Sequence, residues 1–276
     1  MSINSDIYYR RGYYGIIKNN MKFFDRGAVL KDLFIRGIEV DWSSVSEDGY
    51  VYDIKCLRNL KKLEFENPVT FFVGENGTGK STLLEGIAVA YGFNAEGGTK
   101  NYRFSTFDSH SDLYRSLKII KGPVRAYSNY YLRAESFYNV ASKAEEYRGN
   151  DPAEVYYAET GGRSFHEQSH GESFLSLVQG KFLPKGVYIL DEPEAALSPQ
   201  RQLTLLIEIE ALASRGAQFI IASHSPILLG LPGADILSFD GGSIHKCSYT
   251  DTDSYRITEL FINDRENLLR KLLEDK

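Results

Sequence analysis

A glycine-rich octapeptide, preceded by an apolar run and followed by an amphipathic segment, has the clearest chemical signature in this sequence. Residues 74–81 are Gly-Glu-Asn-Gly-Thr-Gly-Lys-Ser, which matches the pattern G-x-x-x-x-G-K-[ST] at every position. Glycines let such a loop curl until several backbone N–H groups point at one phosphate, and the N-terminus of the following helix adds a favourable dipole. The segment therefore predicts a site for nucleotide phosphates.

The side chains of this loop have distinct expected roles. Lys80, one of three predicted catalytic residues, reaches the β- and γ-phosphates, and the Ser81 hydroxyl is a predicted Mg²⁺ ligand. Both residues also belong to the expected nucleotide-binding set, whose other members in this region are Gly74, Asn76, Gly77, Thr78, Gly79 and Thr82. The expected ligands are ATP and Mg²⁺.

Two adjacent carboxylates follow a second apolar run. Asp191 and Glu192 come directly after residues 187–190, at the expected carboxyl end of a strand, where ligands bind in open α/β sheets. Asp191 is predicted to hold Mg²⁺ through water, and Glu192 is predicted to polarise the water that attacks the γ-phosphate. An acidic surface turn is the alternative interpretation, but the position of the pair behind a buried strand favours catalysis.

The apolar pattern predicts the elements that must position these residues. Continuous apolar runs, typical of parallel strands buried on both faces, occupy residues 69–73, 187–190 and 218–223. Helical signals, including a Ser-Pro helix start, occur from residue 81, over 198–214 and over 257–274. Weaker patterns predict strands within 30–40, at 52–57 and near 130–133, and a helix over about 137–147. Together they predict a three-layer α/β fold with a mostly parallel central sheet and a small helical or irregular lobe.

Composition excludes several other classes of protein. The 276 residues contain no stretch of 18 apolar residues and no apolar signal-like segment at the start, so we expect neither membrane insertion nor secretion. Cys56 and Cys247 form no CxxC pair, which excludes a disulfide framework or zinc knuckle and fits a cytoplasmic location. The net charge of −5 argues against a surface that binds nucleic acid throughout, although a local basic strip is compatible with it.

Three further segments carry a family resemblance. Ser169-His170-Gly171-Glu172 lies upstream of Asp191, Ala196-Leu197-Ser198-Pro199 lies downstream, and His224 ends the next apolar run. Together with the glycine loop and the Asp191–Glu192 pair, these segments resemble the ABC-type ATPases over about residues 30–245. The first segment resembles their signature motif with His170 in place of a glycine, 196–199 stands at the D-loop, and His224 stands at the switch histidine.

The resemblance implies a mechanism based on a dimer. In such ATPases the signature of one subunit closes over the γ-phosphate bound by the other, so Ser169 and Gly171 would contact the nucleotide of a second copy. His224, the third predicted catalytic residue, would contact the γ-phosphate and orient the attacking water. No clear Q-loop glutamine is present, and Glu135 is expected to stand in for it as a Mg²⁺ ligand.

The same resemblance sets the expected domains. Residues 1–28 are predicted to be a loosely ordered N-terminal extension, with stacking on nucleic-acid bases as the alternative and Met21 as an alternative start. Residues 29–276 are expected to form a single ABC-type ATPase domain, in which 93–168 is an inserted lobe that carries the Q-loop equivalent.

Departures from the transporter pattern suggest the kind of process served. The stretch 174–182 lacks the arginine-bearing helix of transporter subunits, so the chain looks more like soluble RecF/SMC-type and phage-defence ATPases of the AAA family. A DNA-related or defence-related partner process is expected, and the ATP-binding subunit of a membrane transporter is the alternative. The basic run at 55–62 either touches DNA phosphates or forms a solvated edge, and we favour the edge.

Overall fold

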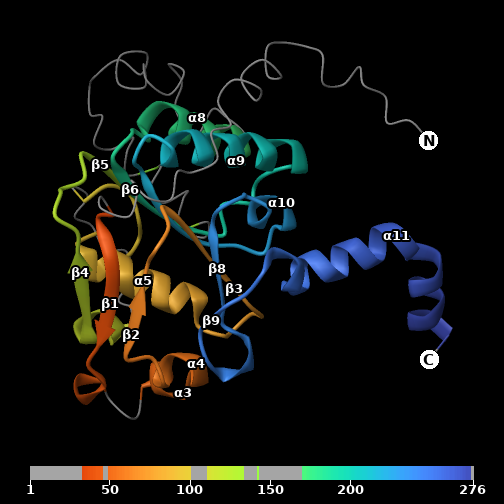
Figure 1. Ribbon diagram of the computed structural model, residues 1–276, viewed down its shortest axis with the longest axis horizontal. Coiled ribbons are helices and arrows are strands. Elements are labelled where there is room, and N and C mark those ends of the chain that lie inside the picture. Colours follow the sequence, from red (N-terminus) through yellow and green to blue (C-terminus); the bar gives the residue numbers. More distant parts are fainter. Residues whose placement is uncertain (1–32, 46–48, 101–110, 134–141, 143–169, 275–276) are drawn as a thin grey trace.

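A parallel β-sheet forms the centre of the molecule. The computed structural model describes residues 33–45, 49–100, 111–133, 142 and 170–274 (Figure 1). The central sheet has the strand order β5 (Ser128–Arg133), β6 (Gly186–Asp191), β7 (Gln218–Ala222), β3 (Val69–Val73), β8 (Asp235–Ser238) and β9 (His245–Lys246). Neighbouring strands from β5 to β8 run parallel, and β9 pairs antiparallel with β8. The mostly parallel α/β sheet expected from the sequence is confirmed.

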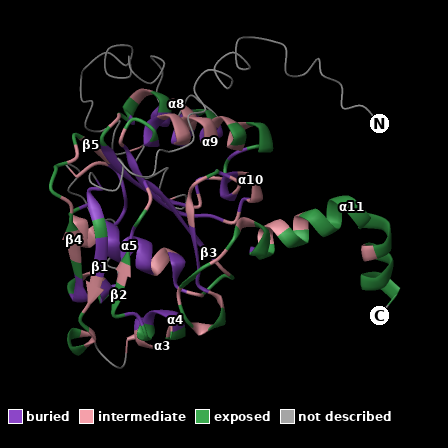
Figure 2. Ribbon diagram, in the orientation of Figure 1, coloured by how far each residue is buried: buried purple, intermediate pink, exposed green. Residues whose placement is uncertain are grey.

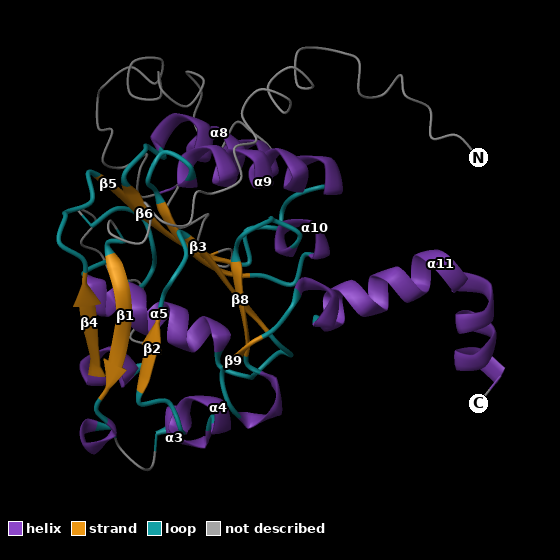
Figure 3. Ribbon diagram, in the orientation of Figure 1, coloured by secondary structure: helices purple, strands orange, loops and turns teal. Residues whose placement is uncertain are grey.

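The central strands are buried on both faces, as their continuous apolar runs predict (Figure 2). Because side chains alternate along a strand, Phe71 and Phe72 of β3 enter two different hydrophobic clusters. The first cluster contains apolar side chains of α8 (His170–Lys181), α9 (Pro199–Ala213) and α10 (Pro226–Leu229). The second contains side chains of α5 (Lys80–Tyr91) and of a smaller sheet, which gives the three layers visible in Figure 3.

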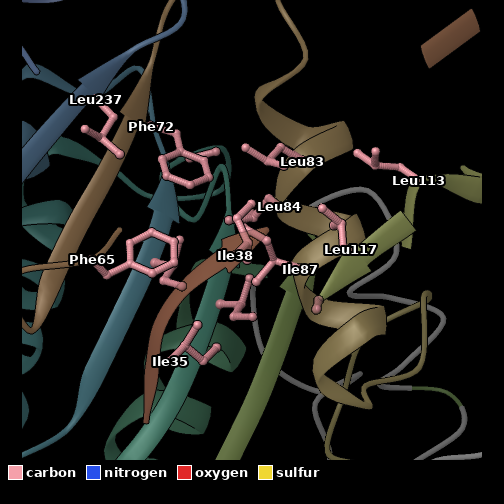
Figure 4. Close-up of a cluster of buried hydrophobic side chains, with 14 of the residues drawn as sticks. Ile35, Ile38, Phe65, Phe72, Leu83, Leu84, Ile87, Leu113, Leu117 and Leu237 are labelled. Carbon is pink, nitrogen blue, oxygen red and sulfur yellow. The ribbon is translucent and has the colours of Figure 1, made fainter. Parts of the chain in front are cut away.

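The smaller sheet is antiparallel and packs on the α5 side of the molecule. Its central strand β1 (Ile35–Val40) lies between β2 (Lys62–Glu64) and β4 (Leu117–Lys121). Ile35 and Ile38 of β1 lie in one buried apolar cluster with Phe72 of β3 and Ile87 of α5 (Figure 4). All four residues are fully buried. Burying each side chain contributes about 1.5–3 kcal/mol to the stability of the fold.

One buried side chain joins the two sheets by hydrogen bonds. Oε1 of Gln218, at the start of β7, accepts from the backbone N–H groups of Phe34 at 3.0 Å and Ile35 at 2.9 Å. Its Nε2 donates to the carbonyl oxygen of Ile35 at 2.7 Å. The amide of Gln218 thereby satisfies three buried backbone groups where β1 enters the antiparallel sheet.

Residues 52–57 do not form the strand that their sequence suggests. They belong to two short helices, α3 (Tyr50–Asp53) and α4 (Lys55–Arg58). Val51 of α3 and Cys56 and Leu57 of α4 are buried, and the extended residue Ile54 separates the two helices. The prediction of a strand at 52–57 is therefore wrong, and the two helices pack beside the glycine-rich loop.

The remaining predictions of secondary structure have different outcomes. Strands within 30–40 and near 130–133 and helices beginning near residues 81, 198 and 257 are confirmed. The helix expected over 137–147 falls almost entirely outside the described residues, as does the extension 1–28. Within 93–168, β4 belongs to the antiparallel sheet and β5 to the central sheet, so the described parts of this region are integrated into both. The domain boundaries stay a prediction.

The helix α11 (Asp253–Glu274) projects from the body of the molecule (Figure 1). It has a non-helical residue, Asp264, and several large apolar side chains along it are exposed. The described 3₁₀ segments are Trp42–Ser44, Asp112–Ser116, Asp240–Gly242 and Tyr249–Asp251. Within the described part of the chain, no helix is both long and apolar enough to cross a membrane.

Candidate functional site: the glycine loop and the carboxyl edge of the sheet

The glycine-rich loop connects the carboxyl end of β3 to the first turn of α5. Three of its glycines adopt positive φ angles: Gly74 (141°), Gly77 (82°) and Gly79 (97°). The Lys80 side chain, only 5% exposed, turns back over the loop and donates hydrogen bonds of 2.7 Å to the carbonyl oxygens of Gly74 and Glu75. Burial lowers the pKa of Lys80 below its ordinary value. The cation is thus held inside the curl that phosphates would occupy.

The segment that forms α3 and α4 packs against one side of this loop. A Cβ added to Gly79 would lie 2.7 Å from Cγ2 of Ile54 and 3.0 Å from Cδ1 of Leu57, so only glycine fits against this wall. The Cys56 thiol donates to the carbonyl oxygen of Thr78. A Cβ on Gly77 would meet nothing within 4 Å, so the loop is supported on one side and open on the other.

The two predicted Mg²⁺ ligands nearest the loop meet directly. The Ser81 hydroxyl, in the first turn of α5, donates a 2.9 Å hydrogen bond to Oδ1 of Asp191, the last residue of β6. Asp191 is only 7% exposed. Mg²⁺ in nucleotide sites is held by one or two protein oxygen ligands together with water and phosphate oxygens. A hydroxyl and a carboxylate at the mouth of a phosphate loop fit that ion.

Glu192 and His224 face each other at the same edge of the sheet. Glu192 has a φ of 50°, and its backbone N–H donates to the carbonyl oxygen of Ala222 at 2.9 Å. Its Oε1 lies 3.7 Å from Nε2 of His224, and both side chains are partly exposed, at 45% and 38%. The His224 Nε2 atom itself is buried and has no hydrogen-bond partner among the described residues. The strands β6 and β7 thus bring the predicted base and the predicted γ-phosphate contact together.

Two carboxylates at this edge were not among the predicted site residues. Oδ1 of Asp240, after β8, accepts a 2.9 Å hydrogen bond from the backbone N–H of Glu75 in the loop. Glu194, two residues beyond Glu192, accepts from the backbone N–H of His224 at 2.6 Å. A signal existed for both: Asp240 follows an apolar run and precedes two glycines, and Glu194 is the last residue of Asp-Glu-Pro-Glu.

The segment expected to act as a signature lies at the start of α8. Gly171 is buried in its first turn, and a Cβ there would lie 2.6 Å from the carbonyl oxygen of Ala196. Glu172 forms a 2.8 Å ion pair with Arg201 of α9. Ser169 lies outside the described residues. The described part of the signature therefore packs on the D-loop segment of its own chain.

The region of the expected Q-loop equivalent is described only up to Arg133. Glu135 lies outside the described residues, so its predicted role as a metal ligand stays a prediction. Arg133 ends β5 and forms a 2.7 Å ion pair with Glu85 of α5, whose other carboxylate oxygen accepts from the backbone N–H of Ser111 at 3.1 Å. This pair anchors the last described residue of β5 to the helix that follows the phosphate loop.

Two open pockets flank the phosphate loop. One of about 600 Å³ lies between α4, the loop and Asp240–Gly242, with Cys56 and Thr78 in its wall. The other, of about 500 Å³, lies between Gly74, His224 and the segment around Thr252. Both volumes fall within the range of small-molecule sites, but Lys80, Ser81 and Asp191 line neither pocket.

Comparison with protein families identifies the kind of site. A family described as "AAA domain" matches residues 52–160, and a family described as "AAA domain, putative AbiEii toxin, Type IV TA system" matches residues 161–230. The two matches adjoin and together include the glycine loop, the Asp191–Glu192 pair and His224. This chain is similar to AAA-domain proteins along the segments that carry the candidate site.

The individual relatives of this chain have different printed functions. The ribose import ATP-binding protein RbsA of Bacillus cereus (strain ZK / E33L) is 24% identical over 223 residues, which are 75% of this chain and 44% of that protein. The structural maintenance of chromosomes protein 6 of Takifugu rubripes is 34% identical over 80 residues, 27% of this chain and 7% of that protein. The chain thus spans less than half the length of the curated relatives that it matches.

The chain also matches solved structures, with low TM-scores. An inward-facing conformation of a putative metal-chelate type ABC transporter is 17% identical, with a TM-score of 0.43, and the match covers 83% of this chain and 89% of that chain.

Proposed function

We propose that this protein hydrolyses ATP with Mg²⁺ and that two copies close head-to-tail around the nucleotide. The observation that carries the Mg²⁺ dependence is the 2.9 Å hydrogen bond between Ser81 and Asp191. It places a hydroxyl and a buried carboxylate side by side at the mouth of the loop that holds Lys80. Ser81 and Asp191 would hold Mg²⁺ there, and the ion would supply positive charge that neutralises the phosphates.

Each residue of the site has a distinct role in the proposed reaction. Lys80 binds the β- and γ-phosphates, and the loop backbone from Gly74 to Ser81, together with Thr82, surrounds them. Glu192 accepts a proton from the water that attacks the γ-phosphate, and His224 contacts that phosphate and orients the water. The 3.7 Å between Oε1 of Glu192 and Nε2 of His224 supports this pairing, since both groups can reach the same water.

The proposed dimer uses the N-terminus of α8 as a lid for the nucleotide of the second copy. A helix N-terminus attracts phosphate because its first N–H groups and its dipole point outward. The packing of Gly171 on Ala196 and the Glu172–Arg201 pair fix this N-terminus to the D-loop. Ser169 and Gly171 would therefore approach a second copy together with the D-loop, as a single surface.

We further propose that hydrolysis serves a nucleic-acid or defence process. The family that matches residues 161–230 is described as a putative toxin of a toxin–antitoxin system, and one relative is a chromosome-maintenance protein. A second candidate is the ATP-binding subunit of a membrane transporter, because a ribose import protein matches three quarters of the chain. Stimulation of turnover by DNA would favour the first candidate, and co-purification with a membrane protein would favour the second.

The core of the proposal is tested by Glu192→Gln. This variant should bind ATP, hydrolyse it at least about 100-fold more slowly and accumulate as a dimer with Mg-ATP, because ATP then stays in the interface. Phosphate release and light scattering after gel filtration measure both effects. Lys80→Ala, which should bind no ATP, is the control for the dimer.

A second variant tests the role of the signature. Ser169→Arg should block the dimer while leaving ATP binding by the monomer intact. A monomeric Glu192→Gln protein in saturating Mg-ATP would contradict the dimer mechanism. Loss of ATP binding in Ser169→Arg would show that Ser169 does not act from the opposite copy.

A further inference from the structure

Glu194 forms a bridge between two segments of the catalytic edge. It lies in the turn between β6 and α9, and its Oε1 accepts from the backbone N–H of His224 at 2.6 Å and from the Ser223 hydroxyl at 2.9 Å. The turn itself is braced, because the backbone N–H of Leu197 donates to the carbonyl oxygen of Glu194 at 2.8 Å. One carboxylate oxygen thus fixes the residue after β7 to the turn after β6.

The bridge continues into the D-loop through a chain of hydrogen bonds. The Ser223 hydroxyl also accepts from the backbone N–H of Ser225 at 3.1 Å, and the Ser225 hydroxyl donates to Oε1 of Gln202 at 2.6 Å. Nε2 of Gln202 in turn donates to the carbonyl oxygen of Leu197 at 3.0 Å. This series of hydrogen bonds begins at Glu194 and ends at Leu197, in the turn that contains Glu194. The His224 backbone and the D-loop therefore belong to one polar network.

The bridge exists although it buries a carboxylate. Oε2 of Glu194 is buried and has no hydrogen-bond partner among the described residues, and burial raises the pKa of the group above its ordinary value. A leucine or methionine would avoid this cost, but neither could accept from the His224 N–H. The structural gain is the position of His224, whose Nε2 lies 3.7 Å from Glu192.

We propose that Glu194 is a positioning residue that sets the switch histidine, His224, against Glu192 and makes its placement depend on the D-loop. The inference rests on the proposed hydrolysis, in which His224 orients the attacking water. Glu194 acts on the reaction indirectly, through the His224 backbone and the Ser223 hydroxyl. Its loss should therefore lower kcat while leaving the affinity for ATP nearly unchanged.

The first test is a double-mutant comparison. Glu194→Met, which removes both acceptors at similar length, should lower kcat by about 10- to 100-fold and change the dissociation constant for ATP less than about threefold. Glu194→Gln, whose amide oxygen can still accept, should recover most of that loss. Glu266→Met on the exposed helix α11 is the matched control. If Glu194 acts through His224, then Glu194→Met should cause no further loss in a His224→Ala background.

The second test needs no turnover. The imidazole signals of His224 in the nucleotide-free protein can be assigned by their absence in His224→Ala, since the chain has five histidines. These signals should shift in Glu194→Met and stay unchanged in Glu266→Met. If Glu194→Met does not fold, Glu194→Asp, which keeps the carboxylate but shortens its reach, provides the same comparison.

The outcomes separate this inference from the proposed function. An unchanged His224 spectrum in Glu194→Met, or a kcat loss that adds in full to that of His224→Ala, would overturn the positioning role. If the wild-type protein releases no phosphate with Mg-ATP, the proposed function fails, and the spectrum of His224 still decides the role of Glu194.

Discussion

The hydroxyl of Ser81 and the carboxylate of Asp191 are joined by a 2.9 Å hydrogen bond although 110 positions separate the two residues in the chain. Ser81 lies in the first turn of α5, which follows β3, and Asp191 is the last residue of β6, which lies two strands from β3 in the central sheet. Their meeting follows from the parallel arrangement, which brings the carboxyl ends of β3, β7 and β6 to one edge. This contact defines the place where a cation would neutralise nucleotide phosphates.

Replacing the hydroxyl of Ser81 should remove the increase in ATP affinity that Mg²⁺ provides, with little other effect. Ser81→Ala is expected to lower the affinity for ATP by about 10- to 100-fold in Mg²⁺, because hydrogen bonds and ligand contacts to charged groups contribute about 1.5–3 kcal/mol. In EDTA its affinity should equal that of the wild type. Equilibrium binding of ATP in both buffers measures the difference, with Ser81→Thr as the control that keeps a hydroxyl. An equal loss in EDTA would contradict the assignment.

The central sheet could be predicted because its strands combine several independent signals. Three signals indicate one strand–loop–helix unit: the apolar run at 69–73, the glycine loop that follows it, and the helical face after that loop. The run at 187–190 ends in two carboxylates and is followed by a Ser-Pro helix start, and Ser198 does cap α9. Each of these boundaries depends on local chemistry, so no tertiary information was needed.

Other features depend on contacts that no local pattern contains. The alternation over 52–57 fits a strand, but the segment forms two short helices separated by Ile54, which lies with Leu57 next to Gly79. In the sequence Asp240 and Glu194 resemble ordinary acidic turn residues. In the fold Asp240, after β8, contacts the phosphate loop, and Glu194, after β6, contacts His224, which follows β7. Their partners are 165 and 30 residues away, beyond the reach of spacing arguments.

The two glycines at positions 77 and 79 should differ in their tolerance of alanine. Both have positive φ, so alanine at either costs about 1–2 kcal/mol of backbone strain. Only at Gly79 does the new Cβ also approach Ile54, at 2.7 Å, which adds about 1–3 kcal/mol of overpacking. Gly79→Ala should therefore lower both the free energy of unfolding and ATP affinity more than Gly77→Ala.

A compensating change makes this comparison sharper. Ile54→Ala removes Cγ2 from the wall, so it should restore part of the stability lost in Gly79→Ala and none of that lost in Gly77→Ala. Urea unfolding of the three single variants and the two double variants measures these changes in the free energy of unfolding. Equal rescue of both glycine variants would show that the wall does not select glycine at position 79.

The amide of Gln218 should be essential for joining the two sheets. Gln218→Leu keeps the volume but leaves the N–H groups of Phe34 and Ile35 and the carbonyl of Ile35 without their partner. An unsatisfied buried polar group costs about 1–3 kcal/mol, so we expect a loss of about 3 kcal/mol or more in the free energy of unfolding. Chemical denaturation measures it, with the exposed Gln179→Leu as control. Similar losses in both variants would contradict this role.

Lys100 should make stability depend on pH in the alkaline range. Its Nζ donates to the carbonyl oxygen of Tyr91 at 2.7 Å and lies 3.4 Å from the centre of the Tyr91 ring. Burial, assisted by the charge of Lys121, lowers the pKa of Lys100 from 10.5 to about 8. Between these two values the unfolded chain binds more protons than the folded protein, so the wild type should gain stability as the pH rises through this window.

The test compares the wild type with Lys100→Met by urea unfolding at several pH values between 7 and 10. The wild type should gain stability relative to the variant as the pH rises above about 8, because only the wild type sheds the cost of a buried ammonium group. Lys118→Met, at a side chain that is 80% exposed, should show no such divergence. Parallel curves for the wild type and Lys100→Met would mean that the ammonium of Lys100 is as well solvated in the folded protein as in the unfolded chain.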